Sequence, residues 1–433
     1  MKTLRSHEWL GVLGVWAVAL SCPGRGPAVS QRTAAPRVEP GIEVLLADSL
    51  QLVRGRRIGL VTNQAGVDAH GVPDVERLRQ AGLNLVALFS PEHGFRGTAD
   101  PGAAIQSSTD STTGLPIYSL YGRNTAPTDE MLAGIDVMLV DLQDAGARYY
   151  TYLFTVTEVM RSAVRRGIPV VVLDRPNPIG GLVQGNVLDT AFASPVGLLA
   201  IPMRHGMTLG ELASLAKHDL GLQTDLRVVP MRGWQRSMYF DQTGLPFLPP
   251  SPNLKTVEAL IHYPGICLFE GTTLSVGRGT DHPFEQIGAP WLDTAAVLSW
   301  LRERSLPGVE FYGVEFTPRD PGDGKYADSA LSGIRFTVTD RNAYDPTAVA
   351  VPLLQALELG IAGNGEILVG PQRVFPPEAR QFDRLMGDGG EFRKALMALE
   401  HGPAPRLTAV RQGWDRSRYE FLTRRRPFLI YPE

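Results

Sequence analysis

Apolar and polar positions alternate along the first half of the chain in a pattern typical of an α/β protein. Short runs rich in Val, Ile and Leu recur, and segments with helical spacing separate them. The strand-like runs cover residues 57–63, 83–90, 134–144, 168–178 and 226–231, and the helix-like segments cover residues 74–82, 151–167 and 208–221. Unbroken apolar strands that alternate with amphipathic helices predict a mainly parallel, Rossmann-like sheet that is covered on both faces.

The second half of the chain has a different pattern. Residues 309–318 and 333–340 alternate with the period of half-buried strands, and residues 346–360 and 391–400 have helical spacing. We therefore expect a Rossmann-like catalytic domain over residues 41–285, followed by a smaller α+β auxiliary domain over residues 286–433. The Gly- and Pro-rich segment 232–284 is predicted to be rich in loops, ordered by its apolar residues and lining a site.

The N-terminus resembles an export signal. Two basic residues precede a 12-residue apolar run, residues 9–20, and Ser21-Cys22 follows at once. A bilayer span takes about 20 residues, so the run fits a signal-peptide core better than a membrane helix. We expect residues 1–40 to be a signal peptide with a Pro-rich linker, and the protein to be exported, either periplasmic or membrane-anchored as a lipoprotein. A lipid on Cys22 is the one membrane contact expected.

Composition narrows the function classes. The 433 residues are 43% hydrophobic and 20% charged, as in a soluble globular protein, and the net charge of -3 argues against a nucleic-acid partner. The second cysteine, Cys267, lies in an apolar run and is expected to be buried. If Cys22 is lipidated or removed, no disulfide can form in the mature chain.

Polar residues follow four of the predicted strands. The clusters are Thr62-Asn63-Gln64, Pro91-Glu92-His93-Gly94, Asp141 to Asp144, and Asp174-Arg175-Pro176-Asn177. Ligands of parallel sheets bind beyond the carboxyl ends of the strands, so these clusters mark the expected site. GxGxxG after the first strand, GxxxxGK[ST], HExxH and GxSxG are all absent. Nucleotide, metalloprotease and serine-hydrolase roles lose their support, and we expect no cofactor and no metal.

The remaining chemistry is that of carboxylates. Glycoside hydrolysis needs an acid that protonates the leaving oxygen, and Glu92 suits this role because Pro91 and Gly94 shape its turn. His93 is a candidate helper, and Asp141 is a second candidate catalytic carboxylate. The alternatives are that Glu92 caps a helix or pairs with Arg96 and that Asp141 caps backbone amides.

Further polar residues are candidates for holding substrate. An arginine could grip a substrate carboxylate, an aromatic ring could stack on a sugar, and Glu270 is a reserve acid. The candidates are Asn63, Gln64, Asp144, Arg148, Tyr149, Arg175, Asn177, Arg204, Glu270 and Arg278. A surface salt bridge is the commoner role for each arginine.

Seven motifs together resemble the exo-β-N-acetylmuramidase family. They are "GLVTNQAGVD", "LFSPEHGFRG", "VDLQDAGARYYTY", "VLDRPNPIGG", "RHGMTLGELA", "PSPNL" and "FEGTTLSVGRGT", in this order. The resemblance runs from about residue 41 to the C-terminal "FLIY". It implies a Rossmann-like domain followed by a smaller one, and release of N-acetylmuramic acid from the non-reducing ends of peptidoglycan fragments. It also implies that Glu92 is the catalytic acid, and it leaves the partner of Glu92 open.

An exo-acting enzyme of this kind must recognise the lactyl carboxylate of N-acetylmuramic acid, which suits an arginine at a pocket mouth. The alternative is a muropeptide-binding protein that cleaves nothing. An amidase or esterase lacks a recognisable nucleophile motif. Retention or inversion of the anomer depends on the separation of the carboxylates, which spacing along the chain does not fix.

Overall fold

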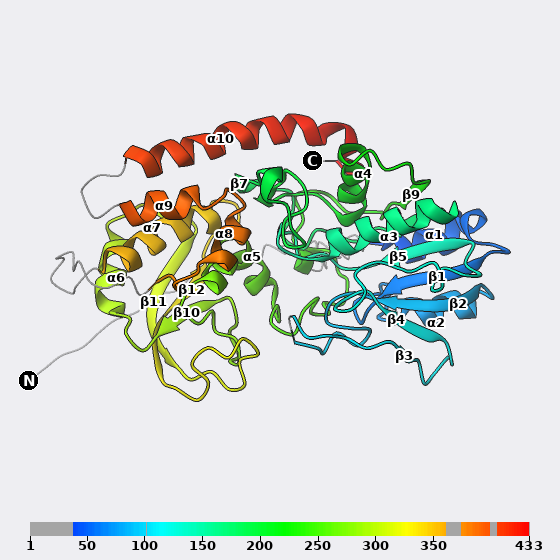
Figure 1. Cartoon of the computed structure of the whole chain (residues 1–433), viewed down its shortest axis with the longest axis horizontal. Helices are drawn as coiled ribbons and strands as arrows, with labels where there is room; N and C mark the ends of the chain where they lie inside the picture. The colour runs from blue at the N-terminus through cyan, green and yellow to red at the C-terminus, as the bar shows by residue number, and fades with distance from the viewer. Residues whose placement is uncertain (1–37, 101, 361–373, 399–404, 433) are drawn as a thin grey trace, which may run out of the picture. The chain divides into compact units, whose positions relative to one another are not determined.

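The larger sheet has seven strands and is mainly parallel (Figure 1). A computed structural model describes residues 38–100, 102–360, 374–398 and 405–432, which belong to one compact unit, Pro36–Glu433. The strand order is β3-β4-β2-β1-β5-β6-β9, with β1 Arg57–Thr62, β2 Asn84–Ser90, β3 Ser108–Thr109, β4 Pro116–Ser119, β5 Val137–Asp141, β6 Val170–Leu173 and β9 Leu226–Val229. In this sheet β3 pairs antiparallel with β4, and the other pairs are parallel. The predicted Rossmann-like sheet is confirmed.

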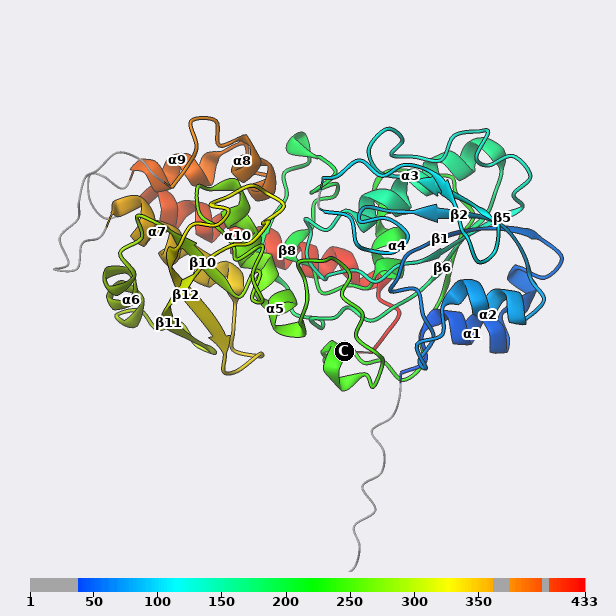
Figure 2. The same cartoon turned by 90° about the horizontal axis from the view of Figure 1, so that it is seen from below.

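Helices cover both faces of this sheet (Figure 2). Helices α1 (Gly41–Asp48) and α2 (Asp74–Gln80) pack on one face, and α3 (Tyr152–Arg166) and α4 (Leu209–Asp219) pack on the other. Alternate residues of each strand serve the two faces. In β5, Val137 and Leu139 join the α1–α2 cluster, and Met138 and Val140 join the α3–α4 cluster.

Local signals fix the ends of these helices. Helix α3 ends at Gly167, which has the left-handed φ of 65° that glycine adopts without strain. Helix α4 begins with a capping box: the Thr208 hydroxyl accepts from the Glu211 amide, and the Glu211 carboxylate accepts from the Thr208 amide.

The smaller sheet is antiparallel and confirms the predicted α+β part. Its order is β10-β12-β11, with β10 Gln286–Ala289, β11 Val309–Phe316 and β12 Leu331–Val338. Its helices are α6 Thr294–Arg302, α7 Pro346–Leu359, α8 Arg380–Met386 and α9 Glu391–Met397. A hairpin of β7 (Gln184–Val187) and β8 (Pro202–Arg204) packs against the long α10 (Pro405–Arg425), which also contacts α9.

The segment predicted to be rich in loops, residues 232–284, also contains helices that the sequence pattern did not reveal. It contains α5 (Val257–Ile266) and the 3₁₀ helix η4 (Cys267–Gly271). Helix α5 is buried from Ala259 onward and so has no polar face, which hides its period in the sequence. No helix among the described residues is long and apolar enough to cross a membrane. The predicted export signal and Cys22 lie outside the described residues.

Candidate active site

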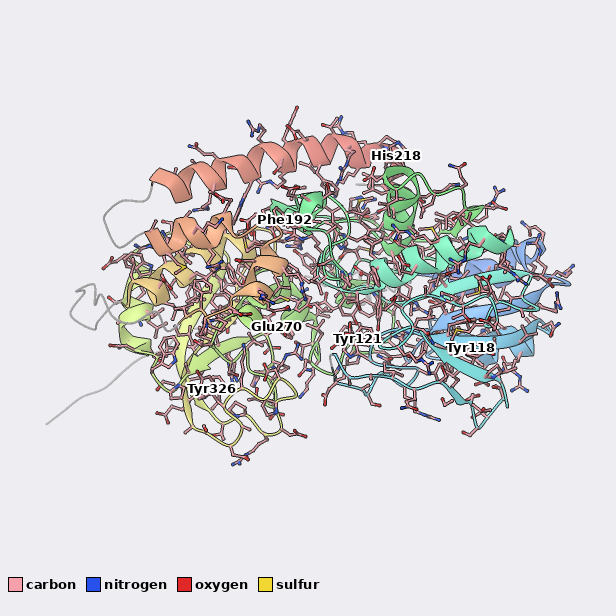
Figure 3. All side chains as sticks on the ribbon, viewed as in Figure 1. Tyr118, Tyr121, Phe192, His218, Glu270 and Tyr326 are labelled. Atoms are coloured by element: carbon pink, nitrogen blue, oxygen red, sulfur yellow. The ribbon has the colours of Figure 1, made fainter. Side chains whose placement is uncertain are left out.

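A cavity of ≈ 660 Å³ opens at the carboxyl edge of the parallel sheet, within the size range of small-molecule sites. We call it the strand-end cavity. Loops after β2, β4 and β5 contribute Glu92, Tyr121 and Thr151, and segments near the smaller sheet contribute Glu270 and Arg278. Tyr121 and Glu270 mark these two sides in Figure 3. The cavity is therefore built from both halves of the chain.

Glu92 is held by donors on both carboxylate oxygens. The Gly102 amide donates to Oε1 over 3.1 Å, and the Thr151 hydroxyl donates to Oε2 over 2.7 Å. Burial raises the pKa of Tyr121, and the Glu92 carboxylate, which accepts a hydrogen bond from the Tyr121 hydroxyl, raises it further. Glu92 is only 9% exposed. The orientation of Glu92 is thus fixed at the wall of a cavity. Its partners are not Arg96, which was the alternative considered.

His93 lies beside Glu92 in an unusual backbone conformation. Its φ is 70°, a left-handed value that non-glycine residues rarely adopt and that often marks functional sites. Nδ1 lies 2.9 Å from the carbonyl oxygen of Ala99. A carbonyl can only accept, so Nδ1 carries the proton, and Nε2 is left as an acceptor in the neutral ring. Burial lowers the His93 pKa, which favours this neutral form.

Aromatic rings form one wall of the cavity. The Tyr149 and Tyr150 hydroxyls donate to the carbonyl oxygens of Pro264 and Pro250, over 3.1 and 2.6 Å. Tyr263 packs edge-on against Tyr149 and against Phe284. Because these two hydroxyls are paired with backbone, the wall offers ring surface to a ligand.

An ion pair lies on the side of the cavity near the smaller sheet. The Arg278 guanidinium binds the Glu270 carboxylate, and its Nη1 is buried without a hydrogen-bond partner among the described residues. Burial alone would lower the Arg278 pKa, but the Glu270 carboxylate outweighs it and raises that pKa. The cavity therefore keeps a charged guanidinium with one unused donor.

Five of the thirteen predicted site residues line the strand-end cavity: Glu92, His93, Tyr149, Glu270 and Arg278. The other eight do not. They are Asn63, Gln64, Asp141, Asp144, Arg148, Arg175, Asn177 and Arg204. Each side chain binds at least one neighbouring protein group, because loops buried at the strand ends carry backbone donors and acceptors that need partners.

Asp141 and Arg175 pair with each other in the interior, outside the lining of the strand-end cavity. Arg175 also donates to the carbonyl oxygen of Val67 over 2.7 Å, and both side chains are buried. Burial raises the Asp141 pKa, and the Arg175 guanidinium opposes that shift. The structure thus places the predicted second catalytic carboxylate in a buried ion pair.

The amide side chains are likewise used within the fold. Asn63 donates to the Tyr152 hydroxyl over 2.7 Å, and Gln64 donates to the carbonyl oxygen of Pro249 over 2.7 Å. Asn177 donates to the carbonyl oxygen of Met207 over 2.9 Å. Each side chain anchors a loop at the sheet edge.

The remaining three fill buried positions. Asp144 accepts from the Gly146 amide over 2.7 Å, and Arg204 donates to Gln184 Oε1 over 2.9 Å. Arg148 donates to the carbonyl oxygens of Leu385 and Met386, at the end of α8, over 2.8 and 3.0 Å. A cation at a helix C-terminus satisfies its free carbonyl groups, so Arg148 positions α8 beside the cavity.

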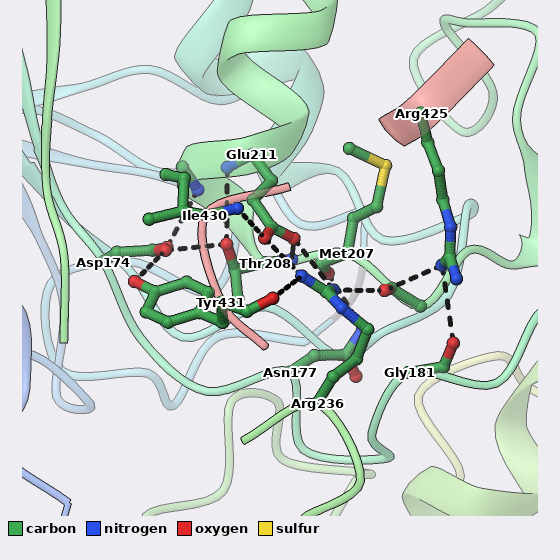
Figure 4. A network of polar contacts seen from close by, with 12 residues as sticks. Asp174, Asn177, Gly181, Met207, Thr208, Glu211, Arg236, Arg425, Ile430 and Tyr431 are labelled. Carbon is green, nitrogen blue, oxygen red and sulfur yellow. Dashed lines mark hydrogen bonds and ion pairs between the residues drawn. The ribbon is translucent and has the colours of Figure 1, made fainter. Parts of the chain in front are cut away.

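A second polar network ties the C-terminus to the larger sheet (Figure 4). The hydroxyls of Tyr431 and Thr208 each donate to Asp174 Oδ2 over 2.6 Å, and the Ile430 amide donates to Glu211 Oε1 over 2.8 Å. Burial raises the Asp174 pKa to about 6, against the hydrogen bonds from Thr208 and Tyr431, which lower it. These bonds attach the C-terminal residues to Asp174, which directly follows β6, and to Glu211.

Comparisons with known proteins agree with this geometry. Residues 58–258 match the family model "Exo-beta-N-acetylmuramidase NamZ, N-terminal", and residues 261–431 match "Exo-beta-N-acetylmuramidase NamZ, C-terminal". The peptidoglycan beta-N-acetylmuramidase NamZ of Bacillus subtilis (strain 168) is 39% identical over 404 residues, which cover 93% of each chain. The chain belongs to the NamZ family of exo-β-N-acetylmuramidases.

Two crystal structures of DUF1343 family proteins from Bacteroides fragilis share the fold of this NamZ family member. One has a TM-score of 0.80 at 32% identity and covers 91% of this chain and 99% of its own. The other has a TM-score of 0.71 at 30% identity and covers 92% of this chain and 100% of its own.

Several cavity residues of this NamZ family member were not predicted from its sequence. Tyr121 follows β4, a strand of only four residues between β2 and β3 that the apolar pattern did not reveal. Thr151 stands directly before α3, whereas the sequence pattern placed it within the predicted helix 151–167 and gave its hydroxyl no role. Arg384 lies on α8, which was also not predicted. Among the described residues, no group of three or more His, Cys, Asp or Glu could hold a metal ion.

Proposed function

We propose that the protein is an exo-acting glycoside hydrolase that releases N-acetylmuramic acid from the non-reducing ends of peptidoglycan fragments, in cell-wall turnover or recycling. The observation that carries this proposal is Glu92, a carboxyl group held by hydrogen bonds on both oxygens at the wall of a ≈ 660 Å³ cavity in a NamZ family chain. A cavity of this size holds one terminal sugar, whereas an enzyme that binds along the polymer would need an extended groove.

Glu92 acts as the general acid. It donates its proton to the glycosidic oxygen as the bond to the anomeric carbon breaks, so the remaining chain leaves with a neutral hydroxyl. Water then bonds to the anomeric carbon, and the proton that this water loses restores the Glu92 acid. Thr151 and the Gly102 amide hold the carboxyl in one orientation during this step. His93 Nε2 accepts a hydrogen bond from a substrate hydroxyl or from the attacking water.

Arg278 recognises the lactyl carboxylate. Among the candidate arginines, Arg278 lines the cavity, whereas the guanidinium groups of Arg148, Arg175 and Arg204 are bound to protein groups elsewhere. Its unused Nη1 group would donate a charge-assisted hydrogen bond to a substrate carboxylate. The aromatic wall of Tyr149 and Tyr263 faces the same cavity and suits the apolar face of a sugar ring.

The decisive experiment replaces Glu92 with Gln, which keeps the shape and removes the transferable proton. We expect Glu92→Gln to lose at least about a hundredfold in release of N-acetylmuramic acid from a chromogenic glycoside. Glu303→Gln, whose side chain is 73% exposed, is the matched control and should be fully active. Tight binding of muropeptides by the wild type with no released sugar would support the non-catalytic alternative.

We also propose that the protein is exported and anchored through a lipid on Cys22. The support is the sequence: a basic start, the apolar run at residues 9–20 and the cysteine that follows. Cys22→Ala should move the protein from the membrane fraction to the soluble exported fraction. Retention of that variant in the membrane fraction would contradict the anchor.

A further inference from the structure

A second cavity adjoins the strand-end cavity. It has a volume of ≈ 450 Å³, and we call it the Phe192 cavity. Pro195 and Arg384 line both cavities, so the two cavities adjoin at these residues. Because an exo-acting enzyme holds only the terminal sugar at its acid, the rest of the chain must leave the first cavity, and the shared residues mark such a path.

The Phe192 ring is an exposed aromatic surface on a rigid support. The side chain is 44% exposed and stands at the end of the 3₁₀ turn η2 (Thr190–Phe192). The Asp189 side chain caps this turn by accepting from the Ala191 amide over 2.9 Å, and the Asp189 amide donates to the carbonyl oxygen of Gly387 over 2.9 Å. The ring lies so close to Gly389 that a Cβ there would come within 2.5 Å of Phe192 Cζ.

The charge of the Phe192 cavity is positive. Asp383 lines it, but both of its carboxylate oxygens accept from the Arg393 guanidinium, over 2.8 and 2.7 Å. Arg384 forms no hydrogen bond or ion pair with any described residue, so its charge is not compensated. The Ser194 hydroxyl also has no hydrogen-bond partner among the described groups although it is buried.

We propose that the Phe192 cavity binds the leaving-group side of the substrate, as a subsite for the sugars that follow the scissile bond. An aromatic face, an unpaired guanidinium and an unpaired hydroxyl together fit an anionic saccharide: a ring face stacks on Phe192, and carboxylates and hydroxyls meet Arg384 and Ser194. Peptide-free peptidoglycan chains carry a lactyl carboxylate on alternate sugars and so match this chemistry. The inference rests on the proposed glycosidase function and adds where the rest of the chain lies.

The test compares substrates of different length on the full-length enzyme. They are a chromogenic N-acetylmuramic acid glycoside, the peptide-free disaccharide and the peptide-free tetrasaccharide. Phe192→Ala should lower kcat/KM for the tetrasaccharide by roughly three- to tenfold, chiefly through KM, and leave the chromogenic glycoside unchanged. Tyr312→Ala is the matched control, because Tyr312 is 43% exposed and lines neither cavity. Tyr312→Ala should leave kcat/KM for all three substrates unchanged.

Binding separates this proposal from the proposed function. Calorimetry on Glu92→Gln should show tighter binding of the tetrasaccharide than of the disaccharide, and adding Phe192→Ala or Arg384→Gln should remove most of that difference. This readout holds even if no bond is cleaved, in which case the glycosidase function fails and the subsite stands. Equal losses for all substrates, or an unchanged preference for the longer chain, would overturn the subsite.

Discussion

The Thr151 hydroxyl donates a hydrogen bond to Glu92 Oε2 over 2.7 Å, although the two residues are 59 positions apart in the chain. Glu92 follows β2, and Thr151 stands at the start of α3, which follows β5. The parallel sheet brings these two strand ends to the same edge, where ligands of such sheets bind. The bond links the proposed acid directly to the start of α3.

Loss of this bond should misplace the acid. A hydrogen bond to a charged group contributes about 1.5–3 kcal/mol, so we expect Thr151→Val to lower kcat by roughly tenfold to a hundredfold. Thr151→Ser keeps the hydroxyl and should restore most of the activity. Thr157→Val removes a hydroxyl of the same helix that binds only the Leu153 carbonyl, and it should be active. Full activity of Thr151→Val would show that Glu92 does not depend on this bond.

Arg278 should determine selectivity for a free lactyl carboxylate. We expect Arg278→Gln to raise KM for the unmodified substrate by roughly tenfold to a hundredfold, because one charge-assisted contact is lost. An analogue with an amidated lactyl group should be a poor substrate for the wild type and respond little to the variant. Arg278→Lys keeps a positive charge beside Glu270 and controls for a defect in folding. Equal losses on both substrates would argue against the recognition role.

The backbone of His93 can be separated from its ring. Asn adopts left-handed φ values more readily than most residues, so His93→Asn should fold with a melting temperature close to that of the wild type, whereas His93→Val should be destabilised. If Nε2 contacts substrate or water, His93→Asn should nevertheless lose about tenfold or more in kcat. An unaltered kcat would leave His93 with a structural role only.

Asp174 should make stability depend on pH. Its pKa is raised to about 6 in the folded protein, above its unfolded value of about 3.9, so the folded state binds the proton more tightly. The resulting stabilisation is fully present below about pH 4 and is lost as pH rises through about 6, and it amounts to about 3 kcal/mol.

The measurement compares wild type and Asp174→Asn by thermal unfolding between pH 4 and pH 7. Asn still accepts from Tyr431 or Thr208 but does not ionise. The wild type should lose stability relative to the variant as pH rises. A constant difference between the two proteins across this range would refute the predicted proton linkage.

The sequence by itself determined the mainly parallel sheet, five of its seven strands and the placement of Glu92 at a strand's carboxyl end. These features depend on local patterns: unbroken apolar runs, helical spacing, and caps such as Thr208 and Gly167. Helix α5 escaped prediction because it is buried all round, and α10 escaped because it is polar and has no apolar stripe.

Only the tertiary structure decided which polar strand ends reach the cavity. Asp141 and Glu92 both follow apolar strands, yet Arg175 pairs with Asp141 in the interior, whereas Glu92 meets Thr151 and Tyr121 at the cavity wall. Such pairings join residues far apart in the chain. Which groups pair depends on which of them the packed fold brings within hydrogen-bond distance. The same long-range packing left Arg278 and Arg384 with unused donors, and local sequence carries no signal of that.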